Sequence, residues 1–113
     1  MTAPSLDGRH FRAADMGAAG EVGAETVFEY HERDGVVWAR YEGGAIGLGF
    51  LVGTRNGDTV EFRYSQLNAA GETSSGRCRS TIAVLPDGRL RLDETWAWES
   101  RPGEGTSTVE EIA

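Results

Sequence analysis

Turn signals recur at short, even intervals along most of this chain of 113 residues, and no other feature constrains its fold as strongly. Five of them, at 33–35, 43–45, 55–57, 69–71 and 86–88, separate strand-sized runs at 25–32, 36–42, 46–54, 58–67, 72–85, 89–99 and 105–112. Short runs between glycine-containing turns are typical of an all-β protein. Four of the five turns are three residues long and end in glycine, which predicts hairpins closed by a type I turn and a bulge.

The segment 88–99 shows most clearly how such a run is built. Its apolar residues Leu90, Leu92, Trp96 and Trp98 stand at alternate positions, and Glu94 is the one polar residue in that series. A period of two predicts a strand with one buried face. Glu94 is therefore predicted to lie on the buried face.

The length of each loop also predicts which residues face one another across the hairpin. With a three-residue loop, the residues at equal distances before and after the middle residue of the loop form facing pairs. Even-numbered residues from Thr26 through Trp98 are then expected to share one interior. The predicted pairs are Val84 with Leu90, Ile82 with Leu92, Ser80 with Glu94, Cys78 with Trp96, Gly76 with Trp98, Phe62 with Cys78, Tyr64 with Gly76, Phe50 with Phe62, Val52 with Val60, Leu48 with Tyr64, Trp38 with Phe50, Arg40 with Leu48, Tyr30 with Trp38 and Phe28 with Arg40.

A short first strand at 10–13 brings the meander to about eight strands. A single sheet with one apolar face buries that face and its edges by closing on itself, so we expect one domain, 1–113, folded as an eight-stranded antiparallel up-and-down barrel. A two-sheet sandwich is the alternative. Residues 1–8 are expected to be a loose lead-in, and 15–24 either a helical turn or a loop. On the outer face, Gly47, Gly49 and Gly53 are expected to permit bending, with Tyr41 covering Gly47.

The net charge of −7 argues against nucleic acid and anionic membranes as partners. No window is long and apolar enough for a membrane-spanning helix, and the N-terminal residues show no apolar signal-peptide region. The one cysteine, Cys78, excludes an internal disulfide. A cytoplasmic location is the simplest expectation.

Glu94 is the main candidate for a functional residue, because an unpaired carboxylate on a buried face costs several kcal/mol. Arg40 is the basic residue predicted on the same face, roughly across the barrel. One hypothesis is that Arg40 and Glu94 flank a ligand cavity. The predicted ligand-binding residues are then Trp38, Arg40, Tyr64, Glu94, Trp96 and Trp98. The alternative is an interior ion pair, with the tryptophans filling the lumen.

Two further sets of side chains bear on function. Cys78 is expected to be an inert buried thiol, and the isolated His10 and His31 predict no metal site; no cofactor is expected. The residues predicted to form an outer apolar patch are Val27, Val37, Ala39, Tyr41 and Leu51. Such a patch can mark an interface, with a homodimer as one candidate, or it can be covered by residues 9–24.

Several motifs resemble those of a family of short bacterial proteins that are often labelled N-acetylglutamate synthase. The likeness covers about residues 20–112 and is most specific in the segment Glu94-Thr95-Trp96-Ala97-Trp98. The label implies acetyl transfer, a reaction whose usual enzymes have an α/β fold with a pyrophosphate-binding turn. In architecture the meander resembles the barrels of the avidins and lipocalins.

Three functional hypotheses follow. The first is a binding module that holds a small apolar or aromatic molecule in the lumen. The second is an enzyme in which burial raises the pKa of Glu94 and makes it the catalytic general acid or base. The third is a structural or interaction domain that dimerises through the outer patch at Val37, Tyr41 and Leu51.

Overall fold

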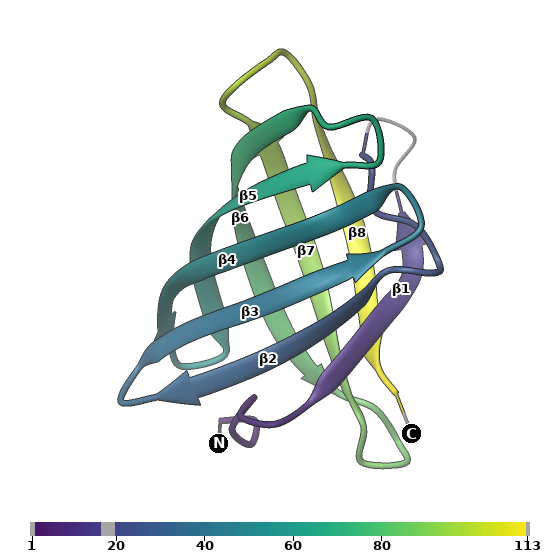
Figure 1. The fold of residues 1–113 in the computed structure, drawn as a ribbon. Helices are drawn as coiled ribbons and strands as arrows, with labels where there is room; N and C mark the ends of the chain where they lie inside the picture. Colours follow the sequence, from purple (N-terminus) through teal and green to yellow (C-terminus); the bar gives the residue numbers. More distant parts are fainter. Residues whose placement is uncertain (1, 17–19, 113) are drawn as a thin grey trace.

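The computed structural model describes residues 2–16 and 20–112, and it confirms the predicted all-β class. Eight antiparallel strands follow one another around a closed barrel in chain order (Figure 1). The strands are β1 (His10–Met16), β2 (Val27–Arg33), β3 (Val36–Gly43), β4 (Ile46–Asn56), β5 (Thr59–Asn68), β6 (Thr73–Val84), β7 (Leu90–Trp98) and β8 (Glu104–Glu111).

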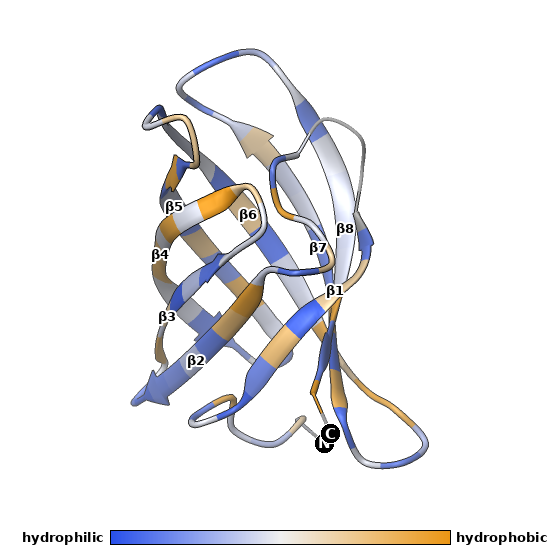
Figure 2. Ribbon diagram, turned by 45° about the vertical axis from the view of Figure 1, so that its right-hand side comes forward, coloured by the Kyte–Doolittle hydropathy of each residue, from blue (hydrophilic) through white to orange (hydrophobic). Residues whose placement is uncertain are grey.

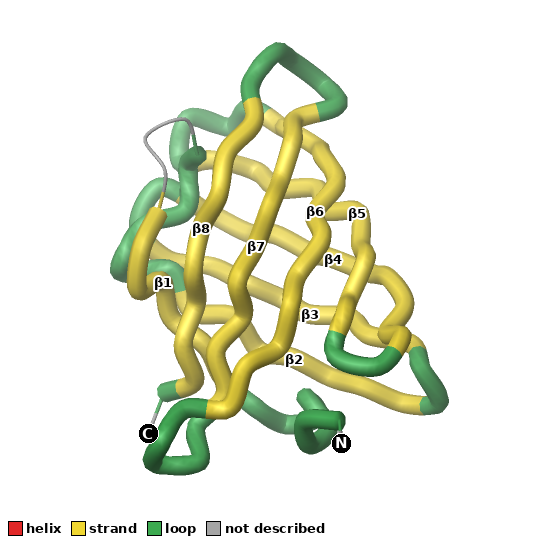
Figure 3. The backbone as a smooth tube through the Cα atoms, turned by 180° about the vertical axis from the view of Figure 1, so that it is seen from behind, coloured by secondary structure: helices red, strands yellow, loops and turns green. Residues whose placement is uncertain are grey.

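The barrel closes where β1 pairs with β8, which places Phe11 beside Glu111 and Ala13 beside Val109. This closure removes both sheet edges and excludes the two-sheet sandwich. The tube in Figure 3 shows strands and connecting loops only, and the described part of the chain contains no helix. Among these residues no helix is therefore long and apolar enough to cross a membrane.

Two of the three-residue loops form as predicted. In the β6–β7 hairpin the amide of Leu85 donates to the carbonyl of Arg89, and Gly88 has a φ of 91°. In the β5–β6 hairpin Gly71 has a φ of 82°. Glycine suits both positions because side chains rarely adopt this left-handed conformation. Across these hairpins Ser80 faces Glu94 and the other predicted pairs hold: Cys78 with Trp96, Gly76 with Trp98, Phe62 with Cys78 and Tyr64 with Gly76.

The other three hairpins have shorter loops than predicted. In the β2–β3 hairpin Arg33 pairs with Val36, so the loop is Asp34-Gly35 alone, with φ of 53° and 79° as a type I′ turn requires. In the β4–β5 hairpin Asn56 pairs with Thr59, which leaves another two-residue loop at 57–58. The pairing is displaced from the predicted one by one residue in the β2–β3 hairpin and by three in the β4–β5 hairpin, and an odd displacement reverses the face of the strand that follows. In the β3–β4 hairpin Gly43 pairs with Ile46, and beyond a bulge the displacement is two residues, so the face does not change.

The two reversals cancel from β5 onward. Only β3 and β4, which lie between the two hairpins, turn the opposite face inward from the one predicted. Even-numbered residues face inward on β2 and on β5–β7 as predicted, whereas odd-numbered residues face inward on β3 and β4. The prediction that Phe50 faces Phe62 is therefore wrong. Phe50 lies opposite Ser65 and is 54% exposed, while its neighbour Leu51 lies inside. Figure 2 shows apolar and polar residues following one another along these strands.

Two strand glycines also lie inside rather than outside. Gly49 pairs with Tyr41, and a Cβ at Gly49 would fall 2.3 Å from Cε2 of that ring. A Cβ at Gly53 would meet the β5 backbone at Phe62. The expectation that an aromatic ring covers a strand glycine is thus met at Gly49 instead of Gly47, and in the lumen.

The N-terminal segment closes the end of the barrel where both termini lie (Figure 1). The sequence predicted a loose lead-in, but Leu6 is fully buried and its amide donates to Glu32. Arg55, which is almost buried, donates to Glu32 and to the carbonyls of Ala3 and Pro4. These contacts close that end of the barrel.

Candidate functional site

A cavity of ≈ 60 Å³ lies in the half of the lumen away from the N-terminal segment. Six aromatic side chains from four strands line it: Phe28, Tyr41, Phe62, Tyr64, Trp96 and Trp98. The other half is filled by aliphatic and aromatic side chains such as Phe11, Leu90, Leu92 and Val109, all fully buried. The volume is well below the roughly 300 Å³ of sites for drug-sized ligands. As it stands, the cavity admits only a small group.

The aromatic rings contact one another around the cavity wall. Trp98 lies edge-on to Trp96 at 5.6 Å between centroids and edge-on to Tyr64 at 5.7 Å. On the other side Phe28 stacks on Tyr41 at 4.7 Å. Edge-on and stacked contacts of this kind are favourable arrangements of aromatic rings. The wall of the cavity is consequently a connected set of aromatic rings.

Glu94 supplies the one carboxylate in the interior of this cavity. Its neighbours on the adjacent strands are serines: Ser107 on β8 donates to Oε1 at 2.9 Å, and Ser80 on β6 donates to Oε2 at 3.3 Å. Burial raises the pKa of Glu94 to about 7, and the two serine hydrogen bonds only partly oppose that rise. The group can therefore change its charge near neutral pH.

The other ionisable groups that influence this region hold their protons. Burial is the main cause that raises the pKa of Tyr30, Tyr41, Tyr64 and Cys78, and the charge of Glu94 raises each of them further. All four remain neutral over the range in which Glu94 titrates. Glu94 is thus the group that sets the charge of the cavity's interior.

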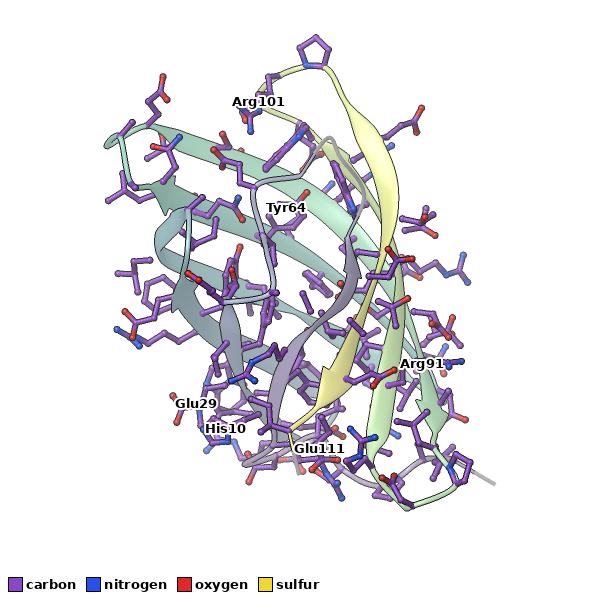
Figure 4. All side chains as sticks on the ribbon, turned by 90° about the vertical axis from the view of Figure 1, so that its right-hand side faces the viewer. His10, Glu29, Tyr64, Arg91, Arg101 and Glu111 are labelled. Carbon is purple, nitrogen blue, oxygen red and sulfur yellow. The ribbon has the colours of Figure 1, made fainter. Side chains whose placement is uncertain are left out.

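The cavity mouth is formed by residues 20–22 and the outer ends of β5 and β7. Glu21 accepts hydrogen bonds from the side-chain amides of Gln66 and Asn68, each at 2.9 Å. Arg101 approaches Glu21 at 3.6 Å, and its guanidinium lies 4.3 Å from the ring centroid of Trp98. Figure 4 shows Arg101 and Tyr64 toward this end of the barrel, and Glu111 at the opposite end. The segment around Glu21 therefore caps the aromatic wall.

Four of the six predicted ligand-binding residues come together at this cavity: Tyr64, Glu94, Trp96 and Trp98. The placement of the other two in the lumen is wrong. Trp38 is 36% exposed and stacks on His31, and Arg40 lies on the outer face of β3, where it pairs with Glu42 at 2.8 Å. Both errors have the same cause, namely the reversed face of β3. No ion pair joins Arg40 to Glu94 in the described chain.

Four of the five residues of the predicted outer patch are placed wrongly for the same reason, and only Val27 lies on the outer face as predicted. Val37, Tyr41 and Leu51 lie inside the barrel, together with Ala39, and none is more than 3% exposed. The apolar residues that do face outward on β3 and β4 are Val36, Trp38, Phe50 and Val52. The dimer hypothesis therefore loses the surface on which it was based.

Sequence reasoning missed several residues of the site. Phe28 and Phe62 were placed on the inner face but not assigned to a cavity, whereas Tyr41 was placed outside. An Asp-Gly pair is a strong signal for a two-residue turn, and at 34–35 it could have placed Tyr41 correctly. Glu21 comes from a segment with no periodic pattern, so nothing in the sequence could have brought it to the mouth.

Neither a metal nor a reactive thiol is indicated at the site. Within residues 2–16 and 20–112, no three His, Cys, Asp or Glu side chains are grouped so that they could hold a metal ion. Cys78 lines the cavity but is buried, and burial raises its pKa well above the usual value. The prediction of an inert buried thiol agrees with this environment.

These features define a class of protein: a small closed antiparallel barrel, sealed at one end, with an aromatic cavity toward the other. The family model described as avidin-like protein matches residues 4–112, nearly the whole chain. The protein therefore belongs to the avidin-like family. Neither the curated proteins nor the solved structures include a significant match.

Proposed function

We propose that this protein is a binding module for a small organic molecule held in the barrel lumen. The observation that carries the proposal is the aromatic cavity with Glu94 in its interior. Trp96, Trp98 and Tyr64 would contact the ligand, and Glu94 would orient it. Membership of the avidin-like family supports small-ligand binding as the general role.

The residues that surround the cavity also suggest how a ligand would enter. The N-terminal segment blocks one end, and the hydrogen bonds of Glu21 to Gln66 and Asn68 bridge the other. These bonds are few and lie at the edge of the barrel, so they can open without disturbing the core. A ligand larger than a few atoms would need this opening and a shift of Tyr64, which is half-buried.

The three tryptophans permit a direct test. In a 15N-labelled sample each gives one indole N–H signal, assigned from Trp38→Phe, Trp96→Phe and Trp98→Phe variants. Titration with phenol, pyrrole and tert-butanol is expected to shift the Trp96 and Trp98 signals while Trp38, on the outer face, serves as an internal control. Shifts confined to Trp38, or none with any small probe, would overturn the proposal.

A second candidate function is catalysis by Glu94 as a general acid or base. The observation that favours it is the pKa of about 7, which suits proton transfer near neutral pH. Any reaction of this kind in the lumen should follow a pH–rate profile with an inflection near that value. Glu94→Gln is expected to abolish such turnover, and an unchanged rate would eliminate this role.

A further inference from the structure

We propose that the lumen binds a small alkylammonium cation, whose charge is held between the aromatic wall and the carboxylate of Glu94. This inference rests on the proposed function and specifies the class of ligand. It is carried by a specific juxtaposition: several aromatic side chains and one buried carboxylate line the same small cavity.

The carboxylate of Glu94 lacks a positive partner in the protein. All 11 basic residues of the chain other than histidine are arginines, and in the described chain none forms an ion pair with Glu94. Its two hydrogen-bond donors, Ser80 and Ser107, are neutral. A buried carboxylate in this situation gains most from a ligand that brings the missing charge.

The wall around Glu94 is of the kind that binds cations. Faces of tryptophan, tyrosine and phenylalanine attract a positive group through their quadrupoles, and aromatic cages recognise quaternary ammonium ligands in this way. The mouth already shows this preference, because the guanidinium of Arg101 lies 4.3 Å from the centroid of Trp98. At the same mouth Glu21 adds a second carboxylate along the entry path.

The size of the cavity restricts the cation to a small one. A volume of ≈ 60 Å³ has room for about four water-sized positions. A trimethylammonium head group is of that size and has no N–H that would need a further acceptor. Larger cations would have to displace Tyr64 or the segment at 20–22.

Cation binding should depend on pH through Glu94. The titratable groups that face it are Cys78 on β6, Tyr30 on β2, Tyr41 on β3 and Tyr64 on β5, and all remain neutral between about pH 5 and 8. Asp93 precedes Glu94 and lies on the outer face of β7, and Glu21 lies at the mouth, where its pKa is lowered. Raising the pH through the pKa of Glu94 should therefore strengthen binding, and binding below that pKa should release protons.

The test compares two probes of nearly identical shape on the full chain. Choline and its neutral analogue 3,3-dimethylbutan-1-ol differ in the charged nitrogen, and isothermal titration calorimetry at about pH 8 measures both. We expect choline to bind at least about tenfold more tightly. Glu94→Gln should remove that preference, whereas Glu61→Gln, on the exposed face of β5, should preserve it.

Proton release provides a second readout that does not depend on the variant's folding. Titrations of the unaltered protein with choline at about pH 6.5, in buffers of different ionisation enthalpy, should show a fraction of a proton released per ligand. Equal or tighter binding of the neutral alcohol would overturn the alkylammonium inference while leaving small-ligand binding intact. If neither these probes nor the phenol and pyrrole of the indole titration bound, both proposals would fail.

Discussion

The hydroxyl of Ser107 on β8 donates a hydrogen bond of 2.9 Å to Oε1 of Glu94 on β7, in the interior of the barrel. The two residues face each other directly in the register of these strands. The bond stabilises the charged carboxylate, yet burial outweighs it and the pKa of Glu94 rises to about 7. The fold therefore tolerates the protonated form better than the charged one.

The first prediction concerns the pH dependence of stability. Because the folded pKa of Glu94 lies above its unfolded value, its protonated form stabilises the fold fully below about pH 4.5, and this contribution is lost as the pH rises through about 7. As the pH rises from about 4.5 to about 7, we expect the free energy of unfolding of Glu94→Gln to increase by roughly 3 kcal/mol relative to that of the unaltered protein. Urea unfolding of both proteins at several pH values measures this; a constant difference would show that Glu94 is not perturbed.

The second prediction concerns the close approach of Tyr41 to Gly49. A methyl group at Gly49 would overlap the ring of Tyr41, which is held by stacking on Phe28 and by its hydrogen bond to Gln66. Gly49→Ala is expected to destabilise the protein by about 1–3 kcal/mol. Gly47→Ala is the matched control on the same strand, because it points outward and meets only ordinary contacts. Equal effects in thermal unfolding would contradict the observed face of β4.

The third prediction tests the register of β4 at adjacent positions. Leu51 is 3% exposed in the lumen, whereas Phe50 is 54% exposed outside. Leu51→Ala should lower the free energy of unfolding by about 2–4 kcal/mol, whereas Phe50→Ala should change it by no more than about 0.5 kcal/mol. Chemical denaturation separates the two cases. A larger loss for Phe50→Ala would restore the register in which even-numbered residues of β4 face inward.

The fourth prediction uses the single thiol as a probe of the cavity. Burial of Cys78 raises its pKa, so the thiolate that reacts with disulfide reagents is scarce in the folded protein. We expect a thiol-exchange reagent at about pH 8 to modify Cys78 only as fast as the barrel opens. Its rate should rise steeply in urea. Rapid reaction in native buffer would show that the lumen is more open than the structure indicates.

Much of this architecture follows from local patterns. The turn signals predicted the strand order and the all-β class, and the alternation in 88–99 predicted the inward positions of Glu94, Trp96 and Trp98. The three-residue loops before Glu72 and Arg89 then placed β5, β6 and β7 in the observed register. These results needed only short-range chemistry, because the loop length and the period of two act within single hairpins.

What the sequence by itself determined is the set of strands and the face of each strand whose pattern is one-sided. β3 and β4 carry apolar residues on both faces, as Trp38 beside Val37 and Phe50 beside Leu51 show, so their patterns could not decide which side is inner. The Asp-Gly pair at 34–35 is the one local signal for the observed face of β3, and the closed barrel decided it for both strands. A two-residue turn moves the register by one, and the lumen has room for Tyr41 over Gly49 on the inner side while Trp38 and Arg40 remain outside.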